Sequence, residues 1–228
     1  MDLLLCQPDD RKGCSACCGL FNFRDISRKH LHSFLQEGQK RQSNVSEDFE
    51  ILLSSTNQVR DITSHICPYQ GFIAPGKPGC LLHPRVLGVE KRGLSLFGAR
   101  ICDGFLCPAH QLLSHHEKCI LINSVDDWYT YTLAIIDTES FRWMITILMG
   151  MTRVDLLDSP HSQRQSIQKA LQVALLRHGE YLTRSEIPLF QYSSSEYNLH
   201  KKGVSLREEN HREEERSIIQ LIRGFFVP

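Results

Sequence analysis

The sequence predicts a mainly helical α+β protein with a small, irregular cysteine-rich region that contains a β-ribbon. Two observations predict this class. All nine cysteines of the 228 residues precede position 120, among glycines and prolines that are typical of short elements joined by tight turns. The rest of the chain instead carries long stretches with apolar residues at helical spacing. We therefore divide the chain into a cysteine-rich region, residues 1–119, and a helical region packed on it, residues 120–228.

The charge balance and the longest apolar window bear on two classes of partner, although a local basic patch stays compatible with zero net charge. The chain has 26 basic and 26 acidic side chains, and 41% of its residues are hydrophobic, enough for a folded core. Zero formal charge removes the field that would draw nucleic acid or anionic lipid to the whole surface. The longest apolar window, residues 133–151, contains three charged side chains, which are costly in a bilayer. We expect no nucleic-acid partner and no membrane partner.

The first ten residues bear on the compartment. MDLLLCQPDD has three leucines and no basic residue, unlike a secretory signal peptide. We therefore expect a cytoplasmic protein. Thiols stay reduced there, so clustered cysteines indicate metal or redox chemistry before they indicate disulfides.

Short elements are expected in the cysteine-rich region. Its N-terminal part has apolar residues near helical spacing followed by a glycine, and a serine further on precedes an acidic run that suits a helix start. Two apolar runs near glycines suit short strands. In chain order we expect a helix over 25–36 ended by Gly38, a helix that begins at Ser46, a ribbon of 86–89 with 94–101, and a helix from Pro108 to Leu113.

The helical region shows the usual signals of helix starts and ends. Its apolar residues repeat at helical spacing, and capping residues precede the expected helices. In chain order we expect a buried helix over 128–151, a helix from Asp158-Ser159-Pro160 to Gly179, a loop over 183–204, and a helix that begins with a capping box over 205–208.

The run GCSACCG, residues 13–19, carries the strongest local signal for chemistry. A two-residue gap lets two thiolates turn toward one ion while backbone N–H groups point at the sulfurs. Zinc needs four ligands, so this run supplies only part of a site. Other cysteines stand beside proline and glycine turns that could bring them to it. The predicted metal ligands are Cys14, Cys17, Cys18, Cys67, Cys80, Cys102 and Cys107.

The adjacent Cys17 and Cys18 bear on the number of ions. Side chains of neighbouring residues leave the backbone in different directions, so the two indicate two ions, a polynuclear cluster or one spare thiolate. Thiolate sites suit zinc and iron–sulfur clusters alike, and the expected cofactor is therefore zinc or iron, an iron–sulfur cluster included. Basic residues close in sequence could offset the thiolate charge. These are Arg11, Lys12, Arg85, Lys91, Arg92 and Arg100.

The cysteine segments together resemble a known family. CSACCG at 14–19, CPYQGF at 67–72, GCLLHPR at 79–85 and CDGFLC at 102–107 are similar in order and spacing to the YkgJ-like cysteine-cluster family of bacterial proteins. The domain of that family is described as zinc- or iron-chelating. The resemblance covers roughly the first half of the chain and implies that its cysteines chelate metal.

The sequence departs from the family's C-x2-C-x2-C-C pattern at two places. The first cysteine of that run is missing, and His83-Pro84 stands where the family has Arg-Pro. These departures leave open how many ions bind. They also leave open whether Cys6, His83 or Cys119 joins the site.

We therefore expect a metal-binding protein in which the metal has at least a structural role. One alternative is an iron–sulfur enzyme with redox or protein-modification activity, similar to a flagellin lysine methylase that has a comparable cysteine domain. Another is a zinc-stabilised module that binds a protein partner. No general base, nucleophile or cofactor loop stands out, so no catalytic residue is predicted.

Overall fold

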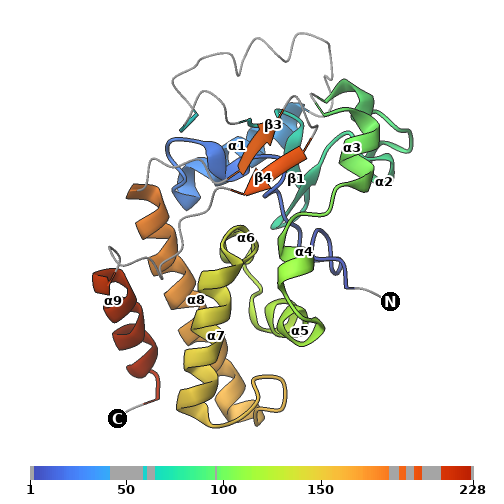
Figure 1. Cartoon of the computed structure of the whole chain (residues 1–228). Helices are drawn as coiled ribbons and strands as arrows, with labels where there is room; N and C mark the ends of the chain where they lie inside the picture. The colour runs from blue at the N-terminus through green and yellow to red at the C-terminus, as the bar shows by residue number, and fades with distance from the viewer. Residues whose placement is uncertain are drawn as a thin grey trace.

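The computed structural model describes residues 3–41, 59–60, 65–95, 97–184, 190–193, 198–201 and 212–226. The fold is mainly helical with small antiparallel two-stranded sheets, which confirms the predicted class (Figure 1). The helix expected from Ser46 and the capping box over 205–208 lie outside the described residues. Within the described residues, no helix has the length and apolar character needed to cross a membrane.

The first half of the chain consists of short elements. A single turn of 3-10 helix, Leu20–Asn22, follows the GCSACCG run. The remaining elements are α1 (Arg28–Arg41), β1 (Gln70–Ala74), β2 (Lys77–Cys80), α2 (Pro84–Leu87), a 3-10 turn (Arg92–Leu94), α3 (Gly98–Gly104) and α4 (Ala109–Leu112).

Helix α1 confirms the helix expected over 25–36, but it does not end at Gly38. The glycine lies inside the helix, against strand β1. A Cβ atom at Gly38 would lie 2.0 Å from the carbonyl oxygen of Gln70, so the glycine permits close approach of α1 to β1. The sequence predicts Gly38 as the end of the helix, whereas in the structure this glycine allows α1 to pack closely against β1.

The ribbon forms over other residues than those expected. Strands β1 and β2 pair antiparallel, with Gln70 opposite Cys80, around a turn in which Gly76 has φ 68°. The segments 86–89 and 94–101 lie instead largely in α2, the 3-10 turn and α3. Helix α2 begins there because His83 caps it and Pro84 occupies its first position. The prediction of these two strands was therefore wrong.

Longer helices make up the second half. They are α5 (His115–Ser124), α6 (Trp128–Ile136), α7 (Thr138–Thr152), α8 (His161–Arg184) and α9 (Arg212–Arg223). The loop expected over 183–204 contains a second ribbon, in which β3 (Phe190–Ser193) pairs with β4 (Asn198–Lys201). Helices α7 and α9 both lie alongside α8 (Figure 1).

The buried helix expected over 128–151 is two helices. Asp137 ends α6 and caps α7, because its carboxylate accepts hydrogen bonds from the backbone N–H and the hydroxyl of Ser140. Helix α8 also continues past Gly179, where the prediction ended it. A Cβ atom at Gly179 would lie 2.9 Å from Leu133, so this glycine again permits two helices to approach closely.

One apolar core runs through both halves of the chain. All residues of α6 are buried. The hydroxyl of Tyr131 donates to the carbonyl oxygen of Leu5 at 2.9 Å, and that of Tyr129 donates to the carbonyl oxygen of Ile26 at 2.9 Å. The N-terminal segment is thus held on the helices of the second half.

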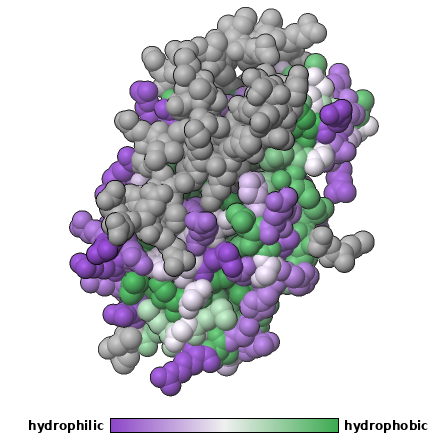
Figure 2. Space-filling model, viewed as in Figure 1, coloured by the Kyte–Doolittle hydropathy of each residue, from purple (hydrophilic) through white to green (hydrophobic). Residues whose placement is uncertain are grey.

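Some apolar side chains remain at the surface of the cysteine-rich half. Figure 2 shows hydrophobic residues mixed with hydrophilic ones on the side where α3 and α4 lie. Four exposed apolar residues belong to this half after β2: Val89, Leu94, Leu106 and Leu112.

Asp137 also lies 3.2 Å from the imidazole of His178, and both side chains are buried. Asp137→Ala would remove the cap of α7 and leave His178 without this partner. We expect the free energy of unfolding to fall by about 2–4 kcal/mol in urea titrations. The control is Glu139→Ala, which changes an exposed side chain in the first turn of α7, and its loss should stay below about 1 kcal/mol. Equal losses would contradict this role of Asp137.

A capping box begins α5. The hydroxyl of Ser114 accepts from the backbone N–H of Glu117, and the Glu117 carboxylate accepts from the backbone N–H of Ser114. Burial raises the pKa of Glu117, but these bonds and the Arg142 guanidinium outweigh it and hold the pKa below its usual value of 4.5.

A carboxylate whose pKa is lowered by folding stabilises the folded state at every pH above its unfolded-state pKa. This contribution is lost as the pH falls through the folded-state pKa. Glu117→Gln should therefore cost about 0.5–1 kcal/mol at neutral pH and progressively less below pH 4.5. Denaturant titrations across pH measure this. Ser114→Ala should cost about 1 kcal/mol at neutral pH, and part of this cost should also disappear at low pH, because the Ser114 side chain helps to lower the pKa of Glu117. A pH-independent Glu117→Gln effect would contradict the prediction.

Candidate metal centre

The structure gathers eight of the nine cysteines, all of them free thiols. Burial raises the pKa of six of the other seven thiols and a hydrogen bond from Cys17 raises that of Cys18; Cys17 is central, because its charge adds to the rise at all seven. We call these eight residues the cysteine cluster: Cys6, Cys14, Cys17, Cys18, Cys67, Cys80, Cys102 and Cys107. All seven predicted ligands belong to it, and Cys6, which the sequence left open, joins them.

Cys119 stands apart from the cysteine cluster. It lies in α5 and lines a depression together with Ile122, Leu156 and Gln168, among others. No other cysteine is part of that lining. Cys119 therefore serves as an internal control for the chemistry of the cluster.

Backbone hydrogen bonds join the segments that carry the cluster. The N–H of Cys14 donates to the carbonyl oxygen of Cys6 at 2.9 Å, and the N–H of Cys67 donates to that of Cys18 at 2.8 Å. The side-chain amide of Gln70 donates to the carbonyl oxygens of Cys18 and Cys67 at 3.0 and 2.7 Å. Because Gln70 also faces Cys80 across the ribbon, it connects three of the cysteine segments.

Gly19 sets the close approach of the GCSACCG turn to the segment before Cys67. It has φ 77°, a left-handed conformation that favours glycine. A Cβ atom at this position would lie 1.8 Å from the carbonyl oxygen of His65. A side chain here would therefore push Cys17 and Cys18 away from Cys67.

At four cysteines the backbone N–H two residues further on lowers the pKa of the thiol, and at Cys14 it donates a hydrogen bond to the sulfur. For Cys14 this distance, from the Ala16 nitrogen, is 3.3 Å. Such bonds stabilise the thiolate form, which is the form that binds metal. The four pairs of N–H group and thiol are Ala16 and Cys14, Tyr69 and Cys67, Leu82 and Cys80, and Ala109 and Cys107.

Burial and mutual repulsion oppose ionisation of the cluster. Burial raises the pKa of the Cys6 thiol to about 12 and that of Cys107 to about 11, with neighbouring thiolates adding to both. The hydrogen bond between Cys17 and Cys18 lowers the pKa of Cys17 and raises that of Cys18. A cation among the sulfurs would reverse this balance, since a coordinated thiol is deprotonated outright.

Arg92 supplies positive charge to one side of the cluster. Burial raises the pKa of Cys80 and Cys102, and the Arg92 charge opposes this at both thiols. The guanidinium is buried and pairs with Glu90 and, at 3.0 Å, with Asp103.

Lys12, also proposed to offset the thiolates, is held by other partners. Its buried ammonium pairs with Asp126 at 3.0 Å and with Asp9 at 3.6 Å, and it donates to the carbonyl oxygen of Ile122. Its charge is therefore compensated by carboxylates.

Three buried polar atoms near the cysteines have no hydrogen-bond partner among the residues that the structure describes: Ser15 Oγ, His65 Nε2 and Gln70 Oε1. Ser15 lies between Cys14 and Cys17 in sequence, and the other two flank Cys67. An unsatisfied buried polar group costs about 1–3 kcal/mol. A polar or charged group bound in this region would give such atoms a partner.

The cluster does not form closed coordination in this structure. Among the described residues, no group of three or more histidine, cysteine or carboxylate side chains is arranged to hold one metal ion. The residues present nevertheless fit a metal that prefers thiolates, because soft sulfur ligands select zinc, copper(I) and iron–sulfur clusters.

Two histidines stand three residues after a cysteine, and the structure distinguishes them. The Nδ1 atom of His83 accepts from the backbone N–H of Arg85 at 3.1 Å, as the cap of α2. The Nε2 atom of His110 instead lies 3.6 Å from the sulfur of Cys6. The sequence analysis missed His110, although the C-x2-H spacing of Cys107 and His110 could have indicated it.

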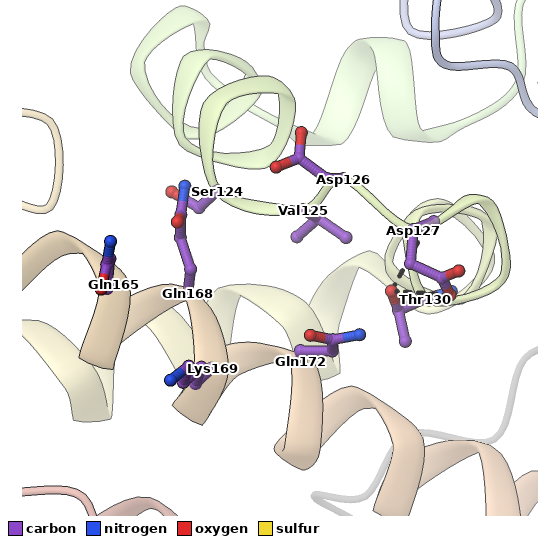
Figure 3. Close-up of a pocket in the computed structure, with 9 residues that line it drawn as sticks. All are labelled: Ser124, Val125, Asp126, Asp127, Thr130, Gln165, Gln168, Lys169 and Gln172. Atoms are coloured by element: carbon purple, nitrogen blue, oxygen red, sulfur yellow. Dashed lines mark hydrogen bonds between the residues drawn. The ribbon is translucent and has the colours of Figure 1, made fainter.

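A depression of about 380 Å³ lies away from the cluster, between α8 and the segment that joins α5 to α6 (Figure 3). Asp126 lies on the joining segment, across from Gln168 and Gln172 of α8. No cysteine lines it. This depression therefore does not belong to the candidate metal centre.

Comparisons of the chain with protein-family models, curated proteins and solved structures return no match. The resemblance to the YkgJ-like family therefore stays a prediction.

The role of Gly19 can be tested with a matched pair of variants. Gly88 has nearly the same conformation, φ 73°, but a Cβ atom there would contact nothing within 4 Å. Gly88→Ala should thus cost only the left-handed backbone penalty, about 1–2 kcal/mol. Gly19→Ala should cost about 2–3 kcal/mol more, because it also forces an atom against the His65 carbonyl. Urea titration of both variants measures the difference, and equal costs would show that the close approach is unimportant.

Proposed function

We propose that this protein binds zinc or iron through the cysteine cluster and that the bound metal stabilises the N-terminal half. The observation that carries the proposal is the convergence of eight free thiols from segments far apart in the sequence. The resemblance to zinc- or iron-chelating YkgJ-like proteins points the same way. We propose the cytoplasm as the compartment, because all nine cysteines are free.

The alternative that the cysteines are only small apolar core residues accounts for less. It gives no reason why the backbone N–H two residues further on lowers the pKa of four of these thiols. It also leaves the unpartnered buried atoms of Ser15 and Gln70 without explanation. Metal binding accounts for both features.

A bound metal would also add to stability. The cysteine-rich half has short elements and few long apolar segments, and an unfolded chain offers no preformed site. The free energy of metal binding then becomes free energy of folding. In this proposal the chain supplies thiolates and the N–H groups that hold them, while the ion supplies the positive charge that keeps the sulfurs together.

The full-length protein, purified without added metal and without oxygen, should contain zinc or iron in stoichiometric amount by elemental analysis. Removal of the metal by a chelator should lower the melting temperature by more than about 10 °C, because structural metals contribute several kcal/mol. Circular dichroism measures this. Colourless protein with zinc supports a structural zinc centre, whereas brown protein with acid-labile sulfide supports an iron–sulfur centre.

Cys67→Ser should lower the metal content, while Cys119→Ser, outside the cluster, should leave it unchanged. Absence of metal from the purified protein, together with a melting temperature indifferent to chelator, would overturn the proposal.

A further inference from the structure

Two depressions outside the cysteine cluster adjoin and form one groove along α8. One is the depression of about 380 Å³ in Figure 3, and the other, of about 600 Å³, is the depression that Cys119 lines. They share Ser124, Asp126 and Gln168 as lining residues. Helix α8 lines the two from Arg164 to Gln172, a stretch of about 12 Å at the rise of an α-helix. We call the joined depressions the α8 groove.

The carboxylates of the α8 groove already have cationic partners. Asp9 and Asp126 pair with the buried ammonium of Lys12 at 3.6 and 3.0 Å. Asp127 pairs with Arg28, which is not part of the lining, and also caps α6. All three acidic side chains in the described lining are therefore compensated by positive charge.

Three cations of the α8 groove are not compensated in this way. Among the residues that the structure describes, Arg11, Arg164 and Lys169 form no ion pair. The guanidinium of Arg164 donates to the carbonyl oxygens of Leu157 and Ser159, both at 3.4 Å, which is longer than usual. All three cationic side chains are exposed. The charge that the groove leaves unpaired is thus positive, and it complements an anionic partner.

The shape of the α8 groove favours an extended chain over a small molecule. Sites for small molecules enclose most of the ligand in a largely apolar cavity. Here exposed polar side chains line the groove, among them Gln165, Lys169 and Gln172. A stretch of about 12 Å accommodates about four residues of an extended peptide. The side-chain amides of Gln165 and Gln172 can both donate to and accept from its peptide groups.

The lining also favours an acidic peptide over a nucleic acid. None of the lining residues that the structure describes is aromatic, whereas single-stranded nucleic acids bind through aromatic side chains on which their bases stack. A continuous chain of phosphates would also pass Asp126, whose side chain is 66% exposed. A peptide carries its carboxylates singly, so it can place them on Arg164 and Lys169 and avoid Asp126.

One end of the α8 groove adds an apolar contact. Ile122, Leu156 and Leu157 line it together with Arg11 and Arg164. An apolar side chain next to the carboxylates of the peptide would be buried there, and this burial would add to the attraction between charges.

We propose that the α8 groove binds an extended acidic peptide segment of a partner protein. The carboxylates of this segment lie on Arg11, Arg164 and Lys169, and an apolar side chain lies over Ile122 and Leu157. The inference goes beyond the proposed function and does not rest on it, because no residue of the cysteine cluster belongs to the described lining.

The test measures binding of the full-length protein to a fluorescein-labelled peptide of eight glutamates and two leucines by fluorescence anisotropy. The matched control peptide has glutamine in place of every glutamate and should bind at least about tenfold more weakly, because it carries no charge. Binding of the acidic peptide should weaken as salt is added, because the pairs are exposed to solvent.

Variants test the assignment of the charges. Arg164→Gln and Lys169→Gln should each weaken binding about twofold to fivefold, whereas Arg164→Lys keeps the charge and should retain most of the affinity. Asp126→Asn should strengthen binding, because it removes one partner of the Lys12 ammonium. Lys29→Gln, at an exposed position of α1 outside the described lining, should leave the affinity unchanged. Circular dichroism establishes that each variant is folded.

Three outcomes would overturn the proposal: no binding of the acidic peptide, equal binding of the two peptides, or equal effects of Lys169→Gln and Lys29→Gln. Tighter binding of a ten-nucleotide single strand than of the acidic peptide would also overturn it and assign the groove to nucleic acid. The metal content of Arg164→Gln and Lys169→Gln should equal that of the unmodified protein, so the proposed function is tested separately.

Discussion

The buried helix α6 is the support on which the cysteine-rich half is built. All its residues are buried, and two of its tyrosines satisfy their hydroxyl groups on backbone carbonyls of the N-terminal segment. Tyr131 reaches Leu5 across 126 residues of sequence. A buried tyrosine needs such a partner, so burial of α6 and placement of the N-terminal segment require each other. The positions of Cys6 and Cys14 therefore depend on a helix that contains no cysteine.

The sequence predicted the class of the fold because helical spacing and turn residues are local signals. The misassigned elements show where local signals are ambiguous. Gly38 and Gly179 look like helix ends, but both allow close packing with an element distant in sequence. Asp137 lies in an apolar run, and only the contact of its carboxylate with Ser140 and His178 reveals a helix break. Tertiary contacts decided the two glycines, whereas at Asp137 a local cap of α7 combines with the distant His178.

The sequence also predicted only part of the candidate site. Spacing within a segment identified the seven expected ligands, which the structure brings near one another. It could not show which distant segments meet, and so Cys6 stayed open and His110 was missed. The two C-x2-H pairs look alike in sequence, yet His83 caps a helix while His110 faces a sulfur. Only the fold distinguishes such pairs.

The bond between Tyr131 and Leu5 can form only after most of the N-terminal half has been synthesised, because its two residues lie 126 positions apart. Every cysteine of the cluster leaves the ribosome before α6 does, since Cys107 precedes Trp128. At about 5–20 residues per second, the nascent chain carries its complete set of thiols for a few seconds before the helix that seats Leu5 has been made. In that interval the sulfurs are open to oxidants and to chaperones, and the chain relies on the reducing power of its surroundings. The order of the segments along the chain thus places the synthesis of all eight thiols before that of the helix that holds the N-terminal segment.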